Sequence, residues 1–218
     1  MWVLRKRWIV AAFLLAILSM VSLGLSVTTI AQAQNLTLPE VARRQGPQQL
    51  PVVQLRDVEL LPDTLEELVQ TSDLIVHGRV QSAESYLSDN QEDIYTDYVL
   101  SPIRVISQGR ALLAKGPFLP TPIVVKRWGG EIVIEKVRFL QILSHLRFFI
   151  PGEEVLLALV SNSHDGKYHI KGAGAFSMKG NEVEPLVDHP RHEQFRGATL
   201  DQFAAEVVRL RSSKPLLP

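Results

Sequence analysis

The chain has 218 residues, a formal net charge of zero and no cysteine. Its length suits one ordinary domain with an additional segment, and the lack of cysteine excludes disulfides, thiol catalysis and thiolate metal sites. The cations nearest the start precede an apolar run, and the remainder of the chain is mildly acidic. Because nucleic-acid binding depends on clustered Lys and Arg, we expect no nucleic-acid partner.

Residues 1–33 have the three parts of a secretory signal peptide. Cations at residues 5–7 come first, an uncharged apolar run follows over residues 8–25, and a polar stretch ends in Ala-Gln-Ala at residues 31–33. The small-x-small ending predicts cleavage after Ala33. The apolar run is also long enough to cross a bilayer, so an uncleaved anchor is the alternative. Both interpretations export the rest of the chain, to the periplasm or the exterior, and membrane contact is expected only through an uncleaved segment.

A linker or extended segment is expected over residues 34–62, which are rich in Pro and Gly and show no sustained periodicity. Asp63 and Glu66 then have the spacing of a capping box, in which each side chain satisfies a free backbone N–H of the first helical turn. Leu65 and Leu68 follow at helical spacing. We therefore predict a short helix that leads into the first strand.

A long hairpin is predicted over residues 72–110. Apolar and polar residues alternate from residue 74 to 81, as in a strand with one buried face. An acidic, turn-forming stretch covers residues 88–93, and residues 95–106 are rich in β-branched and aromatic side chains. His77 lies on the polar side of the alternation, so we expect it at the surface or at a barrel rim.

The chain beyond the hairpin predicts more strands. An irregular loop over residues 109–122 precedes a strand at 123–127, and residues 131–139 continue it or pair with it. Residues 141–149 fit neither period, so a short helix and an irregular crossover both remain open. Residues 155–160 are continuously apolar, as in a strand covered on both faces.

A second hairpin and a final helix complete the predicted domain. The Asp-Gly pair at residues 165–166 predicts a tight turn before a strand at 168–176. Thr199 and Gln202 have capping-box spacing and open an amphipathic helix over residues 199–212. Its apolar positions recur at i, i+3, i+4, i+7 and i+8: Leu200, Phe203, Ala204, Val207 and Val208. We expect one β-rich domain over residues 63–212 and a tail at 213–218.

Three sequence runs resemble a group of exported bacterial proteins: SDLIVHGRV at 72–80, IRVISQGR at 103–110 and PGEEVLLALV at 151–160. The resemblance covers roughly residues 61–186. It implies a mostly-β fold, a small five-stranded barrel similar to the oligonucleotide/oligosaccharide-binding (OB) fold, as in netrin-like and metalloproteinase-inhibitor modules. Those inhibitors chelate a protease metal through an N-terminal cysteine, which this chain lacks. The resemblance therefore implies binding and does not extend to inhibition.

A partner-binding patch is predicted at Lys126, Arg127, Trp128 and Phe148. The first three place cations beside an aromatic ring at a strand end, where barrels of this type can stack a base or a sugar ring. A Trp that closes the barrel mouth between solvated neighbours is the structural alternative. Phe148 belongs to a stretch crowded with apolar side chains, which would contact a partner if several of them are exposed.

Asp188, His189 and His192 place one carboxylate and two imidazoles within five residues. These groups suit zinc or another divalent ion, but Pro190 prevents a regular helix, and a solvated surface loop is the favoured interpretation of the pattern. No nucleophile motif or phosphate loop accompanies them. The sequence thus favours an exported, non-enzymatic module that binds a protein or a glycan without a cofactor. The alternative is a metal-dependent hydrolase built on His189 and His192.

The first testable prediction concerns processing. If signal peptidase cleaves after Ala33, the mature chain begins at Gln34, because the small-x-small site immediately precedes it. Intact-mass and N-terminal peptide analysis of the protein from its exporting host measures this directly. A chain that keeps residues 8–25 would support the membrane anchor instead.

Overall fold

The computed structural model describes residues 36–46, 51–56, 64–109, 122–143, 147–187, 193 and 195–213. The predicted signal peptide and most of the loop at 109–122 lie outside these ranges. In chain order the described elements are α2 (Leu38–Gln45), β1 (Val52–Arg56), α3 (Leu65–Thr71), β2 (Leu74–Leu87), β3 (Ile94–Gln108), β4 (Ile123–Trp128), β5 (Gly130–Ile134), β6 (Val137–Leu143), β7 (Glu154–Ser161), β8 (Tyr168–Lys179), β9 (Glu182–Pro185), β10 (Ala198–Thr199) and α6 (Leu200–Ser212).

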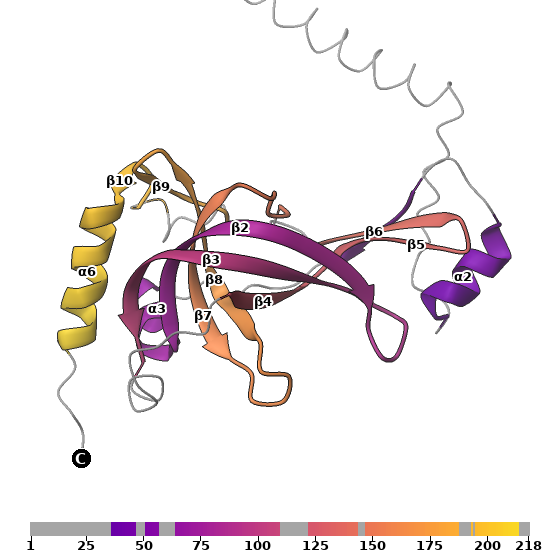
Figure 1. Cartoon of the computed structure of the whole chain (residues 1–218), viewed down its shortest axis with the longest axis horizontal. Helices are drawn as coiled ribbons and strands as arrows, with labels where there is room; N and C mark the ends of the chain where they lie inside the picture. The colour runs from indigo at the N-terminus through magenta and orange to yellow at the C-terminus, as the bar shows by residue number, and fades with distance from the viewer. Residues whose placement is uncertain are drawn as a thin grey trace, which may run out of the picture.

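The fold is mostly β, as predicted, and its strands form two sheets (Figure 1). The larger sheet has the order β10-β9-β8-β4-β3-β2-β7, and the smaller one has the order β1-β6-β5. Helices α3 and α6 lie at one end of the molecule, and α2 lies at the other beside the small sheet. The long β2–β3 hairpin runs between the two ends and is confirmed.

Alternation along the hairpin points Val76, Val80 and Leu100 inward. Three register shifts interrupt the pairing of β2 with β3, and such bulges increase the local twist and bend the strands. The expectation for His77 was wrong, because only 6% of its surface is exposed. The polar side of β2 is covered there by further elements, so its period-2 pattern does not mark a solvent-facing row.

The large sheet does not form the predicted small five-stranded barrel. Strand β8 pairs antiparallel with β7 and parallel with β4, so the sheet curls around a core. The β4–β8 seam, however, consists of only two residue pairs, Val125 with Tyr168 and Lys126 with His169. Because the seam is so short and β9 and β10 extend the sheet beyond it, the two halves face each other as a sandwich and the barrel is not closed.

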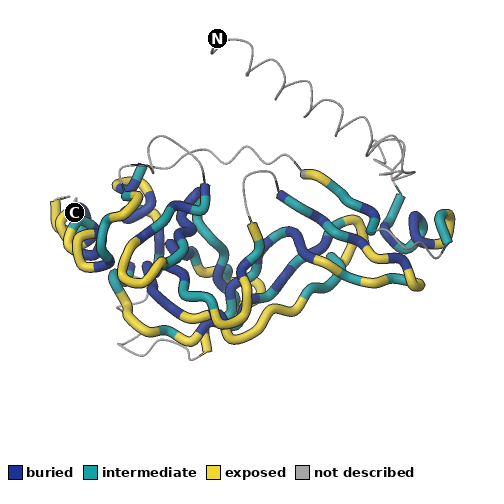
Figure 2. The backbone as a smooth tube through the Cα atoms, turned by 90° about the horizontal axis from the view of Figure 1, so that it is seen from above, coloured by how far each residue is buried: buried dark blue, intermediate teal, exposed yellow. Residues whose placement is uncertain are grey.

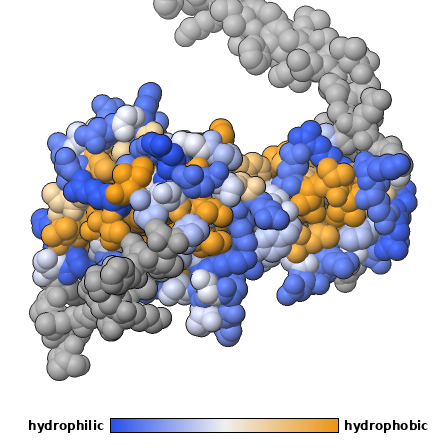
Figure 3. Space-filling view, viewed as in Figure 1, coloured by the Kyte–Doolittle hydropathy of each residue, from blue (hydrophilic) through white to orange (hydrophobic). Residues whose placement is uncertain are grey.

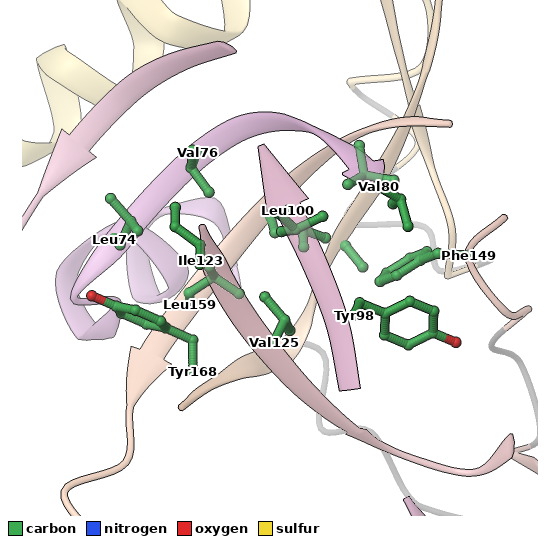
Figure 4. Close-up of a cluster of buried hydrophobic side chains, with 13 residues drawn as sticks. Leu74, Val76, Val80, Tyr98, Leu100, Ile123, Val125, Phe149, Leu159 and Tyr168 are labelled. Atoms are coloured by element: carbon green, nitrogen blue, oxygen red, sulfur yellow. The ribbon is translucent and has the colours of Figure 1, made fainter. Parts of the chain in front are cut away.

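One hydrophobic core lies between these halves (Figure 4). Side chains from β2, β3, β4, β7 and β8 form this core. The rings of Tyr98 and Phe149 meet edge to face in it, with centroids 4.9 Å apart. Residues 155–159 of β7 are all buried, in agreement with the prediction for residues 155–160, although Val160 is only partly buried. The core members are Leu74, Val76, Val80, Tyr98, Leu100, Ile123, Val125, Phe149, Val155, Leu157, Leu159, Tyr168 and Ala175.

The segment expected to be a linker or an extended segment contains α2 and β1. Helix α2 begins at a Thr37–Glu40 capping box, and β1 pairs in parallel with β6. Leu38 and Val52 bury their side chains with Phe139 in a separate small core, so this segment is held by packing. The ambiguous stretch after residue 141 is partly resolved: β6 continues to Leu143, and residues 144–146 lie outside the described ranges.

One face of the small sheet packs into the small core. The other face carries the strongly exposed Leu55 and Val133 together with the ion pair of Glu131 and Arg138. Apolar side chains gather over the β5–β6 part of the molecule in the space-filling view (Figure 3).

Two sheets meet where β4 passes into β5 through Gly129 and Gly130. Gly130 has φ +153°, and a Cβ there would lie 2.3 Å from the Oγ1 of Thr96 and 2.6 Å from the Oγ of Ser85. The Thr96 hydroxyl donates to the carbonyl oxygen of Gly129 over 2.6 Å, and the backbone N–H of Ile94 donates to a buried glutamine on β6. Only glycine fits this crossing, because the hydroxyls occupy the space of a side chain.

The two helices α3 and α6 cover the outer side of the large sheet. The predicted capping box of α3 was one residue off: Thr64 is the N-cap and pairs with Glu67, while Asp63 lies outside the described residues. The C-terminal helix and its Thr199–Gln202 box are confirmed, but Val208, which we expected in the apolar stripe, is exposed, and Leu210 is buried instead. Its buried stripe and exposed outer face are visible in the burial view (Figure 2). The apolar side chains of both helices pack on Ile75, Leu156 and Phe176.

Truncation of Phe203 should destabilise the protein strongly. The ring is 2% exposed and packs edge to face on Phe176 at 5.2 Å and on Phe195 at 5.5 Å. Phe203→Ala should lower the free energy of unfolding by about 3–5 kcal/mol through lost burial and a cavity. Val208→Ala on the same helix is the matched control, since Val208 is 55% exposed and should change it by less than about 0.5 kcal/mol. Urea unfolding of both variants measures the difference, and equal effects would contradict the docking of α6.

Candidate functional site

Strand alternation divides the predicted patch of Lys126, Arg127, Trp128 and Phe148. Along β4, Lys126 and Trp128 are half-buried on the outer face, whereas Arg127 is buried on the core-facing side. Phe148 is half-buried, and one of its ring carbons lies 3.5 Å from the position that a Cβ of Gly129 would occupy. The four side chains therefore do not form one continuous surface.

Lys126 lies at the centre of an aromatic and charged cluster on the outer face. Its ammonium nitrogen lies 4.6 Å from the ring centre of Tyr95 and 5.9 Å from that of Tyr86, which are cation–π distances. It also pairs with Asp165 at 3.5 Å. Burial opposes the charge of Lys126, but Tyr86 and Asp165 outweigh burial and raise its pKa. The cation is thus held ionised over two aromatic rings.

A second lysine joins the cluster from the turn between β7 and β8. Lys167 forms an ion pair with Asp97 on β3, and its nitrogen lies 5.2 Å from the Tyr86 ring centre. The Tyr86 hydroxyl donates to Asp97 over 3.1 Å. The hydrogen bond to Asp97 raises the pKa of Lys167, and burial together with the charge of Asp97 raises the pKa of Tyr86. The phenol therefore stays neutral and the lysine charged near neutral pH.

Asn162 in the turn after β7 and His169 on β8 complete the cluster. The Nε2 atom of His169 lies 3.8 Å from Asp165 and 3.2 Å from the amide nitrogen of Asn162. Burial opposes ionisation of Asp165, but the N–H of Lys167 and the charge of Lys126 lower its pKa. This carboxylate is held ionised between a lysine and an imidazole.

A surface pocket of about 390 Å³ opens beside this cluster, at the tip of the β2–β3 hairpin. Its walls combine two tyrosine rings and one ammonium group with the polar side chains of the acidic turn. The lining residues are Tyr86, Leu87, Ser88, Asp89, Asn90, Asp93, Tyr95 and Lys126. We call this pocket and the residues Asp97, Asp165 and Lys167 the hairpin site.

A separate charged cluster lies on β2 and β7. The Nε2 atom of the buried His77 lies 3.0 Å from Glu154, which also accepts a 2.6 Å hydrogen bond from Arg79. The hydrogen bond from Arg79 lowers the pKa of Glu154, and His77 adds to this effect. Among the described residues, the Nδ1 atom of His77 is buried without a hydrogen-bond partner. This arrangement joins two strands.

Sequence reasoning found Lys126 but missed the tyrosines and Lys167 of the hairpin site. Tyr86 and Tyr95 flank the predicted turn at equal distances, and they pair directly across the hairpin. A register count outward from the turn could have placed them together. Lys167 and Asp97 offered no such signal, because β3 and the β7–β8 turn are 70 residues apart in the chain.

Asp188, His189 and His192 lie outside the described residues, so the predicted metal site stays a prediction. Within the described ranges, no three His, Asp or Glu side chains come together in a way that could hold a metal ion. No helix of the described chain is long and apolar enough to cross a membrane.

The comparisons with known proteins add no relative. No protein-family model matches the chain, and no curated protein matches it. The chemistry of the hairpin site therefore carries the functional argument.

Removal of the Tyr86 hydroxyl should cost a hydrogen bond to a carboxylate. Tyr86→Phe should lower the free energy of unfolding at neutral pH by about 1 kcal/mol. The raised pKa of Tyr86 means that the folded state favours the neutral phenol, so this contribution is present below about pH 10 and is lost as the pH rises through the raised folded value. Urea unfolding at neutral and alkaline pH tests both parts.

Tyr95→Phe is the matched control for Tyr86→Phe. Tyr95 stacks against Tyr86 with centroids 6.3 Å apart, but in the described chain its hydroxyl makes no hydrogen bond. Its substitution should leave stability nearly unchanged at both pH values. An equal loss in the two variants would show that ring packing, and not the bond to Asp97, holds this part of the site.

Proposed function

We propose that the chain is an exported, non-enzymatic binding module whose protein or glycan partner docks at the hairpin site. One observation carries this proposal: two tyrosine rings, two lysines and a pocket of about 390 Å³ share the outer face of β2, β3 and β4. Sites that bind molecules combine apolar or aromatic walls with a few convergent polar groups. Tyrosine suits such a surface, because its ring contacts apolar groups while its hydroxyl forms hydrogen bonds.

The strand pairing supports an open variant of the OB-like arrangement. Strands β2, β3 and β4 pair in sequence, and β8 pairs with β7 on one side and parallel with β4 on the other. In folds of that type, ligands lie along the second and third strands and between the first and fourth loops. The equivalent features here are β3, β4 and the turns at residues 88–93 and 162–167, which border the hairpin site.

The ion pairs within the site favour binding over catalysis. Asp97 is held by Lys167, and Asp165 is held between Lys126 and His169. A general acid or base requires a pKa near the working pH, whereas these lysines remain charged and the pKa of Asp165 is lowered. Groups fixed in this way provide orientation and charge complementarity to a bound partner.

The Tyr95→Ala/Lys126→Ala double variant should lose the partner. Crosslinking of the tagged full-length chain in intact cells, with mass spectrometry of the captured material, should identify one dominant envelope or secreted partner for the wild type. Loss of the ring and the cation should reduce its recovery by at least about 10-fold, as expected for interface anchors each worth 1 kcal/mol or more.

Lys179→Ala is the matched control for that experiment, because Lys179 is an exposed lysine at the far end of β8 and outside the site. Its variant should capture the partner as the wild type does. Equal capture by the double variant would place the partner elsewhere on the molecule. If no protein is captured reproducibly, binding of the wild type and of the double variant to a glycan array decides between a glycan partner and failure of the proposal.

A further inference from the structure

Arg127 is a charged residue on the core-facing side of β4. Alternation along the strand points it the same way as the buried Ile123 and Val125. Only 6% of its surface is exposed, and its Nε atom is fully buried. A guanidinium remains ionised in proteins, so this position carries a full charge inside the fold.

The surroundings balance this charge only in part. The Nη1 atom donates to the carbonyl oxygen of Arg147 over 2.7 Å, and the Cζ atom lies 4.9 Å from the ring centre of Phe149. The Nε atom has no hydrogen-bond partner, and no carboxylate of the described chain forms an ion pair with Arg127. Burial, and after it the like charge of Arg147, lowers the pKa of Arg127.

A buried charge without an opposite charge destabilises a protein, and an apolar side chain of similar volume would normally stabilise this position better. Departures of this kind from the packing rules are concentrated at functional sites. A ligand that supplies the missing negative charge would explain why an arginine occupies this buried position.

The edge of the guanidinium that makes no hydrogen bond in the described chain indicates which chemical group would complete its bonding. Nη1 is used by the Arg147 carbonyl, which leaves the edge formed by Nε and Nη2 without an acceptor in the described chain. That edge presents two parallel N–H groups, the geometry that a carboxylate accepts with both oxygens. We infer that Arg127 is a second binding site, whose Nε–Nη2 edge takes a carboxylate group of a ligand.

The cover of this site is the segment at residues 147–150, which has no regular secondary structure. Its contacts with the guanidinium are the Arg147 carbonyl and the Phe149 ring, and Ile150 on the same segment is exposed. For a ligand to reach the Nε–Nη2 edge, this segment has to move aside and take the Phe149 ring out of its contact with Tyr98. The site is separate from the hairpin site, because Lys126 lies on the opposite face of the strand.

Thermal unfolding of the full-length chain in acetate tests the inference. At pH 7 and equal ionic strength, replacing sodium chloride with sodium acetate should raise the Tm of the wild type by about 2–4 °C, because a ligand that binds only the folded state stabilises it. Arg127→Met should show no acetate-dependent rise. Its Tm in chloride should equal or exceed that of the wild type, since a long apolar side chain then replaces an uncompensated charge.

Two further variants separate this site from general effects of charge. Arg127→Lys keeps the cation but lacks the two parallel N–H groups, so its response to acetate should fall to half of the wild-type response or less. Arg147→Met removes an exposed arginine that is paired with Glu153, and it should leave the acetate response intact. No acetate-dependent rise in the wild type, or the same rise in Arg127→Met, would overturn the inference. So would a full response in Arg127→Lys combined with a large loss of Tm in Arg127→Met.

Two larger probes distinguish the sources of the carboxylate. N-acetylglycine represents the carboxyl terminus of a peptide, and glucuronate represents an acidic sugar. The source that stabilises the wild type more than acetate, and does so only when Arg127 is present, identifies the ligand class. If neither probe raises the Tm although acetate does, the inference of a ligand site is overturned, because only a bare small anion then fits.

Discussion

The close crossing at Gly129 and Gly130 is the constraint on which the arrangement of the molecule depends. The hydroxyls of Thr96 and Ser85 fill the space in which a side chain of residue 130 would lie, and a Thr96 hydrogen bond holds the carbonyl of Gly129. The backbones of Gly129 and Gln141 also approach closely, since a Cβ on Gly129 would lie 2.9 Å from the carbonyl oxygen of Gln141. Strand β4 therefore ends on the large sheet and β5 begins the small one with a single residue between them. The side chain of Gln141 joins both sheets by accepting from the Ile94 N–H.

Both proposed binding sites follow from the direction in which β4 enters this crossing. Strand β4 has to pair with β3 up to Trp128, and this pairing sets which side chains face outward. Lys126 then stands over the tyrosines of the hairpin, while Arg127 points into the end of the core beside Phe149. One strand thus carries two cations that serve opposite faces of the sheet, each held against an aromatic ring.

Local patterns were sufficient where neighbouring residues decide the structure. Alternation predicted the β2–β3 hairpin, and helical spacing with a capping box predicted α6, since both depend on contacts within a few turns or across one tight loop. The barrel prediction failed because closure depends on β4 meeting β8, which are far apart in the chain and share only two residue pairs. The segment around α2 was mistaken for a linker, because its packing partner Phe139 lies about 100 residues further on.

The sequence by itself determined that strands dominate, that a hairpin organises the domain, and that Lys126 and Arg127 adjoin an aromatic residue. Those properties follow from period, turn chemistry and residue type, which act over short stretches of chain. Only the tertiary structure decided that Lys167 and Asp97 would meet Tyr86, that His77 would be buried, and that Arg127 would lack a counter-ion among the described residues. These outcomes depend on long-range pairing and on how much water each position loses, and a one-dimensional pattern specifies neither.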